Sequence, residues 1–165
     1  MKKKYGFLIH FLIKMGLLVA AGCLVWTYAL CFHRISGNNM FPAGKDGDLG
    51  IVYQLEECHT GDLVWYETPD GTGKYGRIVA VPGQEVDFPE EGGYLVNGYQ
   101  PAEEVLYETY RDKESGIKYP VTLAEDEYFI LNDYRDDTAD SRDYGPIKAS
   151  AIKGKVIFLL RRRGF

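Results

Sequence analysis

The pattern of hydrophobic and polar positions divides the chain into two unlike parts. Residues 6–32 read GFLIHFLIKMGLLVAAGCLVWTYALCF, an apolar run in which Lys14 is the one Lys, Arg, Asp or Glu. A helix needs roughly 20 apolar residues to cross the hydrocarbon core of a bilayer, so this run is long enough. Its apolar character extends around the whole helix, which argues against a helix that packs one face on a core. We therefore predict a transmembrane anchor over residues 6–32.

A cleaved signal peptide is the alternative for this run. Its apolar region would be shorter, about 7–15 residues, and small residues would mark a cleavage site. Here the run is longer and ends in CFHRIS, which offers no such site. The lysines at positions 2–4 favour a cytoplasmic end for residues 1–5. We expect a single-pass protein of the cell membrane, with lipid around residues 6–32 and an extracytoplasmic domain over residues 33–165.

The second part of the chain alternates short apolar runs with turn signals, which is typical of strands. The runs cover residues 49–55, 61–67, 75–81, 94–99, 127–133 and 151–160. Asn97-Gly98 and Asp70-Gly71 are typical hairpin turns. Residues 101–120 are charged and weakly patterned, and we interpret them as a mobile lobe. The pattern predicts a mainly β, antiparallel domain behind one N-terminal helix.

The net charge of residues 33–165 argues against one class of partner. Residues 33–165 hold 15 basic and all 24 acidic residues, a formal charge of −9. This balance argues against a general nucleic-acid-binding surface, so no nucleic acid is expected as a partner. The basic end, RRRGF, is either a solvated terminus or a contact with anionic lipid headgroups.

Cysteine and histidine contribute little candidate chemistry. Cys23 and Cys31 lie in the apolar run and only Cys58 lies outside it, so disulfides do not hold the domain together. Cys58 is followed by His59, but no further Cys or His pair completes a metal-ligand set. The glycines and lysine at 71–76 lack the spacing of a phosphate-binding loop. We expect no metal and no cofactor.

Four segments carry the candidate chemistry. They are GNNMFP at 37–42 with KDGD at 45–48, GDLV at 61–64, GRIVAVPG at 76–83, and NDYRDDTADSRDYG at 132–145. In this order, behind an anchor, they resemble the motifs of the type I signal peptidases of the S26 family. These are membrane-anchored serine proteases with a Ser–Lys dyad, and the resemblance covers nearly the whole chain. It implies the antiparallel β fold of that family.

The resemblance places two unexpected residues at the dyad. Asn39 falls on the nucleophilic serine and Gly76 on the lysine that serves as general base, while Thr138 falls on the hydroxyl that orients the lysine. An amide has no acidic proton to give up to a base, and glycine has no side chain, so neither can play the role that the resemblance implies. Other departures from the family pattern are Ala43, Gly44, Asn132 and Tyr134.

The remaining motif residues receive two kinds of expected role. Those expected to bind substrate are Gly37, Met40, Pro42 and Ile78. Those expected to support the site are Arg77, Asp133, Arg135, Asp140, Ser141 and Arg142. Asp140 with Arg142, and Asp133 with Arg135, match two family pairs. Each pair either braces a working site through charge-assisted bonds or only staples a loop.

The resemblance implies a function without cleavage. Members that lack both dyad residues are known among Gram-positive pilus-assembly factors, so we expect a binding or assembly factor for an exported protein, such as a pilin or a sortase partner. The alternative is an active signal peptidase I that uses substitutes, with Ser36 as nucleophile. Lys74, two residues before Gly76 on the same strand face, would be its base. A third possibility is a decaying copy with no role.

Overall fold

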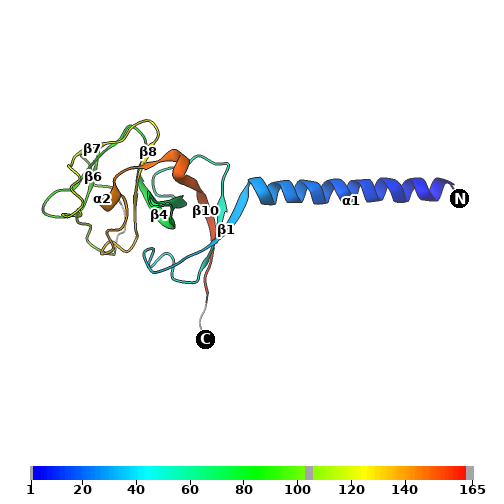
Figure 1. Cartoon of the computed structure of the whole chain (residues 1–165), viewed down its shortest axis with the longest axis horizontal. Helices are drawn as coiled ribbons and strands as arrows, with labels where there is room; N and C mark the ends of the chain where they lie inside the picture. Colours follow the sequence, from blue (N-terminus) through cyan, green and yellow to red (C-terminus); the bar gives the residue numbers. More distant parts are fainter. Residues whose placement is uncertain (1, 103–105, 163–165) are drawn as a thin grey trace.

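A computed structural model describes residues 2–102 and 106–162, and shows a long helix attached to a β domain (Figure 1). Helix α1, Lys2–Tyr28, projects away from the domain. Its segment Gly6–Tyr28 is long and apolar enough to cross a membrane. The N-terminal apolar helix and the β domain behind it confirm the expected fold class.

Most strands belong to one antiparallel sheet of seven. In chain order these strands are β1 Leu30–Arg34, β2 Leu49–Tyr53, β3 Leu63–Glu67, β4 Gly73–Ala80, β8 Glu127–Leu131, β9 Ile147–Lys148 and β10 Ile152–Leu160. Their order across the sheet is β1-β2-β10-β3-β4-β8-β9. The last strand, β10, therefore lies between β2 and β3 and closes the sheet around strands far apart in sequence.

A second, smaller sheet lies at the end of the domain far from α1 (Figure 1). Its strands are β5 Glu85–Asp87, β6 Leu95–Val96 and β7 Val121–Thr122, in the order β6-β5-β7. The short helix α2, Ser141–Tyr144, and a 3₁₀ turn, Ala149–Ala151, connect β8, β9 and β10.

Three apolar clusters stabilise this arrangement. One lies under the small sheet and includes Phe88 and Phe129. The second, around Val64, Tyr66, Ile78, Ile130 and Ile147, covers one face of the large sheet. The third packs Ile35, Met40, Val52 and Tyr75 against the other face. The central strands are buried on both faces, which explains why their sequences read as apolar runs without clean alternation.

The structure differs from the expected anchor at its C-terminal end. The helix ends at Tyr28, and residues 30–34, which the sequence assigns to the anchor and its exit, form β1. The pairing of Leu30 with Tyr53 and of Arg34 with Leu49 decides this change, because the apolar residues 30–32 suit a strand as well as a helix. Ala29 alone joins the two elements.

The other boundaries differ by a few residues. Residues 94–99 form only the short strand β6 followed by a turn at Asn97 and Gly98, both with positive φ. Of the expected lobe 101–120, residues 103–105 lie outside the described part of the chain. The described remainder is irregular, and the carbonyl of Tyr110 accepts a hydrogen bond from Arg142.

Candidate functional site

The first motif forms a loop between β1 and β2, and Asn39 points from it into the domain. The residue is 8% exposed. The amide nitrogen Nδ2 donates to the carbonyl of Tyr75 at 2.9 Å and to Oδ1 of Asn132 at 3.0 Å. The backbone carbonyl of Asn39 accepts from the amide of Tyr134 at 2.9 Å. Asn39 therefore ties this loop to β4 and to the segment that follows β8.

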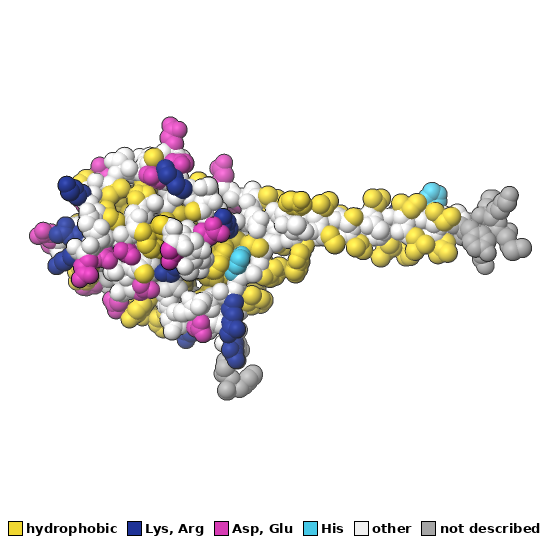
Figure 2. All heavy atoms as spheres, in the orientation of Figure 1, with side chains coloured by type: hydrophobic (Ala, Val, Ile, Leu, Met, Phe, Trp, Pro, Cys, Tyr) yellow, Lys and Arg dark blue, Asp and Glu magenta, His cyan; other side chains and the backbone are white. Residues whose placement is uncertain are grey.

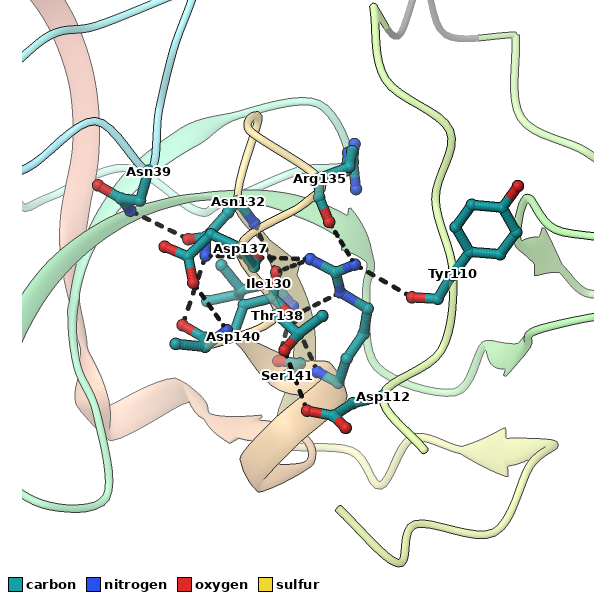
Figure 3. Close-up of polar contacts among 12 residues, drawn as sticks. Asn39, Tyr110, Asp112, Ile130, Asn132, Arg135, Asp137, Thr138, Asp140 and Ser141 are labelled. Atoms are coloured by element: carbon teal, nitrogen blue, oxygen red, sulfur yellow. Dashed lines mark hydrogen bonds and ion pairs between the residues drawn. The ribbon is translucent and has the colours of Figure 1, made fainter. Parts of the chain in front are cut away.

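Asn132, one of the departures from the family pattern, continues this chain of hydrogen bonds (Figure 3). It is fully buried, and its own Nδ2 donates to the carbonyl of Asp137 at 3.0 Å. Its backbone amide donates to Oδ2 of Asp140 at 2.9 Å. Two residues that depart from the motif and lie 93 positions apart in the sequence are thus joined by a side-chain hydrogen bond. Sequence reasoning noted Asn132 as a departure but gave it no role at the site.

Gly76 lies on β4 opposite Val64, next to Ile130 and Tyr66 of the second apolar cluster. A Cβ atom at this position would lie 2.4 Å from Ile130 Cγ2 and 2.9 Å from Tyr66 Cε1. Both distances are shorter than van der Waals contact, so the space that a lysine side chain would enter is already filled. The position at which the resemblance predicts the base is therefore closed.

The phenol of Tyr66, which lies beside Gly76, is buried, and that of its hydrogen-bond partner Tyr144 is half-buried. The hydroxyls of Tyr66 and Tyr144 share a hydrogen bond of 2.8 Å, and Tyr144 also donates to the carbonyl of Ala139 at 3.1 Å. Burial raises the pKa of both phenols above the ordinary value for tyrosine. Both hydroxyls therefore stay protonated at neutral pH, and neither can replace the lysine as a general base.

The substitute pair, Ser36 and Lys74, is not assembled as a dyad. Lys74 lies on the same strand face as Gly76, as the two-residue spacing implies. Its ammonium, however, donates to the carbonyl of Ala139 at 2.7 Å. Ser36 is exposed at the start of the 36–48 loop. A base must lie within hydrogen-bond reach of its nucleophile, and the Lys74 ammonium is engaged elsewhere.

Thr138, expected to orient the base, makes a different contact. Its hydroxyl donates to Oδ2 of Asp112 at 3.0 Å, a residue of the irregular segment before β7 (Figure 3). This bond joins the loop after β8 to that segment. The orienting role itself stays a prediction.

The pair Asp140 and Arg142 is the centre of a polar network, and Figure 3 labels Asp140 among its members. Both side chains are fully buried, and Arg142 Nη2 lies 2.8 Å from Asp140 Oδ2. The same guanidinium donates to the carbonyls of Tyr110, Arg135 and Asp137. Burial raises the pKa of Asp140, and the hydrogen bonds and charge of Arg142 oppose that rise. Next to this pair, buried Ser141 accepts a bond from the amide of Ile130.

The second expected pair, Asp133 with Arg135, is not the pairing in the structure. Asp133 instead binds Arg77 in a bidentate ion pair, with Nε to Oδ1 at 2.7 Å and Nη2 to Oδ2 at 2.6 Å. The guanidinium of Arg135 lies over the ring of Tyr94. The end of β8 lies beside Arg77 of β4, because Arg77 pairs with Leu131, and this places Asp133 within reach. Arg142 binds carbonyl groups of loops, and Arg77 joins β4 to the end of β8. These contacts are those of residues that stabilise the fold.

The residues expected to bind substrate lie in unlike environments. Met40 and Ile78 are fully buried, in separate clusters on opposite faces of the sheet. Gly37 has a φ of +83° and donates its amide to Asp46 at 2.9 Å, and Pro42 is exposed. The structure does not gather these four into one surface, and their substrate-binding role stays a prediction.

An open pocket of about 330 Å³ lies next to Asn39. It is lined by Asn38, Phe41, Lys45 and Tyr134. The Lys45 ammonium lies 5.1 Å from the centre of the Phe41 ring, and Tyr107 packs edge-on against Tyr134 at 5.0 Å. Sequence reasoning missed this pocket, although it had noted Tyr134 as a departure. Within residues 2–102 and 106–162, no cluster of His, Cys, Asp and Glu could hold a metal ion.

Comparison with known proteins gives a consistent result. Residues 8–160 match the family model described as "Signal peptidase, peptidase S26". The chain is 27% identical over 158 residues to the "Inactive signal peptidase IA" of Staphylococcus aureus, covering 90% of this chain and 88% of the relative. It is 28% identical over 139 residues to the "Signal peptidase I" of Bacillus licheniformis, covering 77% of this chain and 74% of the relative.

A solved structure of a signal peptidase I from Enterococcus faecalis overlaps with a TM-score of 0.49 at 20% identity, covering 62% of this chain and 98% of that one. The family model alone spans most of the chain, from within the apolar helix to the end of β10. The chain therefore belongs to the S26 family of signal peptidases.

Proposed function

We propose that this chain is a membrane-anchored S26 protein that does not cleave peptides. In this proposal it binds an extended segment of an exported protein, as an assembly factor for a pilin or a sortase partner. Helix α1 would hold it in the membrane, and the β domain would present the binding site. The relative named as an inactive signal peptidase is consistent with the first part of this proposal.

The occupied dyad positions carry the proposal. Acyl transfer needs a nucleophile and a base in contact, and loss of such a pair removes most of the rate. Here the side-chain amide of Asn39 donates hydrogen bonds to Tyr75 and Asn132. Ile130 and Tyr66 fill the space beside Gly76. The site has therefore become part of the packed interior.

The pocket beside Asn39 supports a binding role. Phe41 and Tyr134 supply apolar walls, and Lys45 supplies a positive charge at the same opening. An extended segment could place an apolar or aromatic side chain in this pocket and pair a neighbouring carboxylate with Lys45. Proteins that bind extended peptides usually obtain their specificity from pockets of this kind, which recognise individual side chains of the peptide.

Calorimetry of the detergent-solubilised full chain tests this function. Peptides from candidate pilins and sortase partners are titrated into the unchanged protein, into Tyr134→Ala and into the control Tyr99→Ala, which alters an exposed tyrosine of the small-sheet region. We expect Tyr134→Ala to weaken binding at least about tenfold, or about 1.4 kcal/mol, with no change for Tyr99→Ala. Absence of heat with every candidate, together with normal assembly in a deletion strain, would count against the proposal.

Incubation with a preprotein tests the alternative activity. We expect no cleavage by the full chain, because Lys74 is bound to Ala139 and the dyad positions are filled. Cleavage that Ser36→Ala abolishes would instead establish an active signal peptidase with a substitute nucleophile.

A further inference from the structure

A second open pocket lies beside the small sheet. It has a volume of about 400 Å³ and lies between the segment just before β6 and the irregular segment before β7. Among its described lining residues, Glu91 and Glu108 are the charged ones, and both are exposed. The apolar part of the lining comes from Tyr94, Leu106 and Tyr107. We call this site the Glu91–Glu108 pocket.

This pocket and the pocket beside Asn39 are separated by two tyrosine rings. Tyr107 lines the Glu91–Glu108 pocket, and Tyr134 lines the pocket beside Asn39. The two rings pack edge-on with 5.0 Å between their centroids. One extended polypeptide that passes over this ring pair can therefore place side chains in both pockets.

Hydrogen bonds connect the parts of the chain that line the two pockets. The amide of Gly93 donates to the carbonyl of Thr109 at 2.7 Å, and both residues line the Glu91–Glu108 pocket. Buried Arg142 donates to the carbonyls of Tyr110 and Asp137, and so joins the segment before β7 to the loop after β8. The two pockets are thus held together before a ligand binds, which lowers the conformational entropy that binding costs.

The two pockets carry charges of opposite sign. Lys45 supplies an ammonium to the pocket beside Asn39, whereas the other pocket presents two carboxylates. The guanidinium of Arg135 lies over the ring of Tyr94, but Arg135 is only 2% exposed. Figure 2 shows Asp and Glu side chains on the domain, including its end far from α1, and none along the described part of α1. A ligand that matches both pockets therefore carries a negative and a positive group, and such complementary charges fix the register of a bound partner.

We infer that the Glu91–Glu108 pocket is a second subsite for the bound polypeptide and takes a lysine or arginine side chain. This inference rests on the proposed function. The ammonium or guanidinium lies between the two carboxylates, and the aliphatic part of the side chain packs on the tyrosine rings. Glu108 is already positioned, because its carboxylate accepts a hydrogen bond from the hydroxyl of Tyr110.

The two subsites together define a sequence pattern for the ligand. An apolar or aromatic side chain enters the pocket beside Asn39, and a neighbouring carboxylate pairs with Lys45. Side chains on one face of an extended chain recur about every 7 Å, so the basic residue lies about two or four positions from the aromatic one.

Selection from a random peptide library tests this pattern with the detergent-solubilised full chain. The peptides have about twelve residues, which is long enough to cross both pockets in extended form. We expect Lys and Arg to be enriched at a fixed spacing from an aromatic residue that has an acidic neighbour. Glu91→Gln combined with Glu108→Gln should remove the basic preference alone, and Lys45→Gln should remove the acidic preference alone.

The possible failures are distinguishable. Enrichment of aromatic and acidic residues without a basic residue would overturn this inference and leave the proposed function standing. A basic preference that persists in the chain with Glu91→Gln and Glu108→Gln would also overturn it. Absence of any enriched peptide would overturn the proposed function and this inference with it.

Calorimetry with the most enriched peptide measures the contact itself. Replacing its basic residue with norleucine should weaken binding to the unchanged chain at least about threefold, and should have little effect on binding to Glu108→Gln. The matched control is Glu90→Gln, which removes a carboxylate next to Glu91 in sequence that pairs with Arg111 and lines a different pocket. An equal effect of norleucine in all three proteins would overturn the assignment of the basic residue to this pocket.

Discussion

Asn39 donates two hydrogen bonds from one side chain, whereas a serine hydroxyl can donate only one. The identity of the residue at the nucleophile position is therefore tied to two acceptors, Tyr75 and Asn132. The sequence was sufficient to predict substitutions at 39 and 76 from the resemblance. It could not reveal that Asn132, Ile130 and Tyr66 fill the site, because those contacts join residues distant in sequence and arise only on folding.

The first prediction concerns the amide of Asn39. Asn39→Ser should lower the free energy of unfolding by about 1–3 kcal/mol, because one buried acceptor loses its donor. Thermal unfolding of the solubilised chain measures this. The control is Asn38→Ser, where the replaced side chain is exposed, accepts an exposed hydrogen bond from the amide of Asp46 at 3.2 Å, and should cost at most about 0.5 kcal/mol. Equal effects of the two changes would show that the Asn39 bonds contribute nothing to stability.

The second prediction concerns the closed position at Gly76. Gly76→Ala should cost about 1–3 kcal/mol, since its new methyl group overlaps Ile130 and Tyr66. In a double-mutant cycle the cost should fall when Ile130→Ala is already present, because Cγ2 of Ile130 is then gone. Urea unfolding of the four proteins measures the coupling. Additive costs would mean that Ile130 does not close the position.

The third prediction concerns reactivation. Asn39→Ser combined with Gly76→Lys supplies both dyad residues, yet we expect no cleavage of a preprotein, because the lysine would start inside the Ile130 and Tyr66 contacts. A gel assay with purified preprotein measures this. A processed product from this double variant would show that the site opens more easily than its packing indicates.

Among the elements, the strands differ in how clearly the sequence marks them. The runs at 49–55 and 127–133 contain β2 and β8, and the run at 75–81 covers most of β4, because local apolar residues and flanking turns suffice to mark buried strands. Strand β1 was hidden, since its residues continue the apolar run of α1 and become a strand only by pairing with β2. Strands β5 and β7 are too short to carry a pattern, and the Asp133–Arg77 pair depends on how β4 and β8 align.

Strand β1 yields the fourth prediction. A domain that begins at residue 35 lacks β1 and leaves the edge of β2 and the side of Val52 uncovered. We expect this shorter domain to aggregate, whereas one that begins at Ala29 stays monomeric and folded. Size-exclusion chromatography and circular dichroism compare the two. A well-folded product from residue 35 onward would show that β1 is dispensable.

The α2 region yields the fifth prediction. Arg142→Met leaves the buried carboxylate of Asp140 without its partner and should cost about 3–5 kcal/mol, part of which Asp140→Asn should recover. The control, Lys148→Met, removes an exposed partner of Asp126 and should cost at most about 1 kcal/mol. Urea unfolding of the domain beginning at Ala29 provides the comparison. A small effect of Arg142→Met would contradict its stapling role.

On the scale of the whole molecule, the helix and the domain are joined through Ala29. The amide of Ala29 donates to the carbonyl of Val25 in α1, and the carbonyl of Ala29 accepts from the amide of Gln54 beyond β2. The residue between the two elements is thus hydrogen-bonded to both. Such a junction leaves little room for the domain to turn independently of α1.

This junction has a consequence for the membrane-anchored protein that we propose. A spanning helix leans when the hydrocarbon layer is thinner than its apolar length. Because Ala29 is hydrogen-bonded to both elements, a tilt of α1 would also tilt the domain. The distance between the Phe41–Tyr134 pocket and the lipid surface would then change. Bilayer thickness would then select which stretch of an emerging polypeptide the pocket can reach.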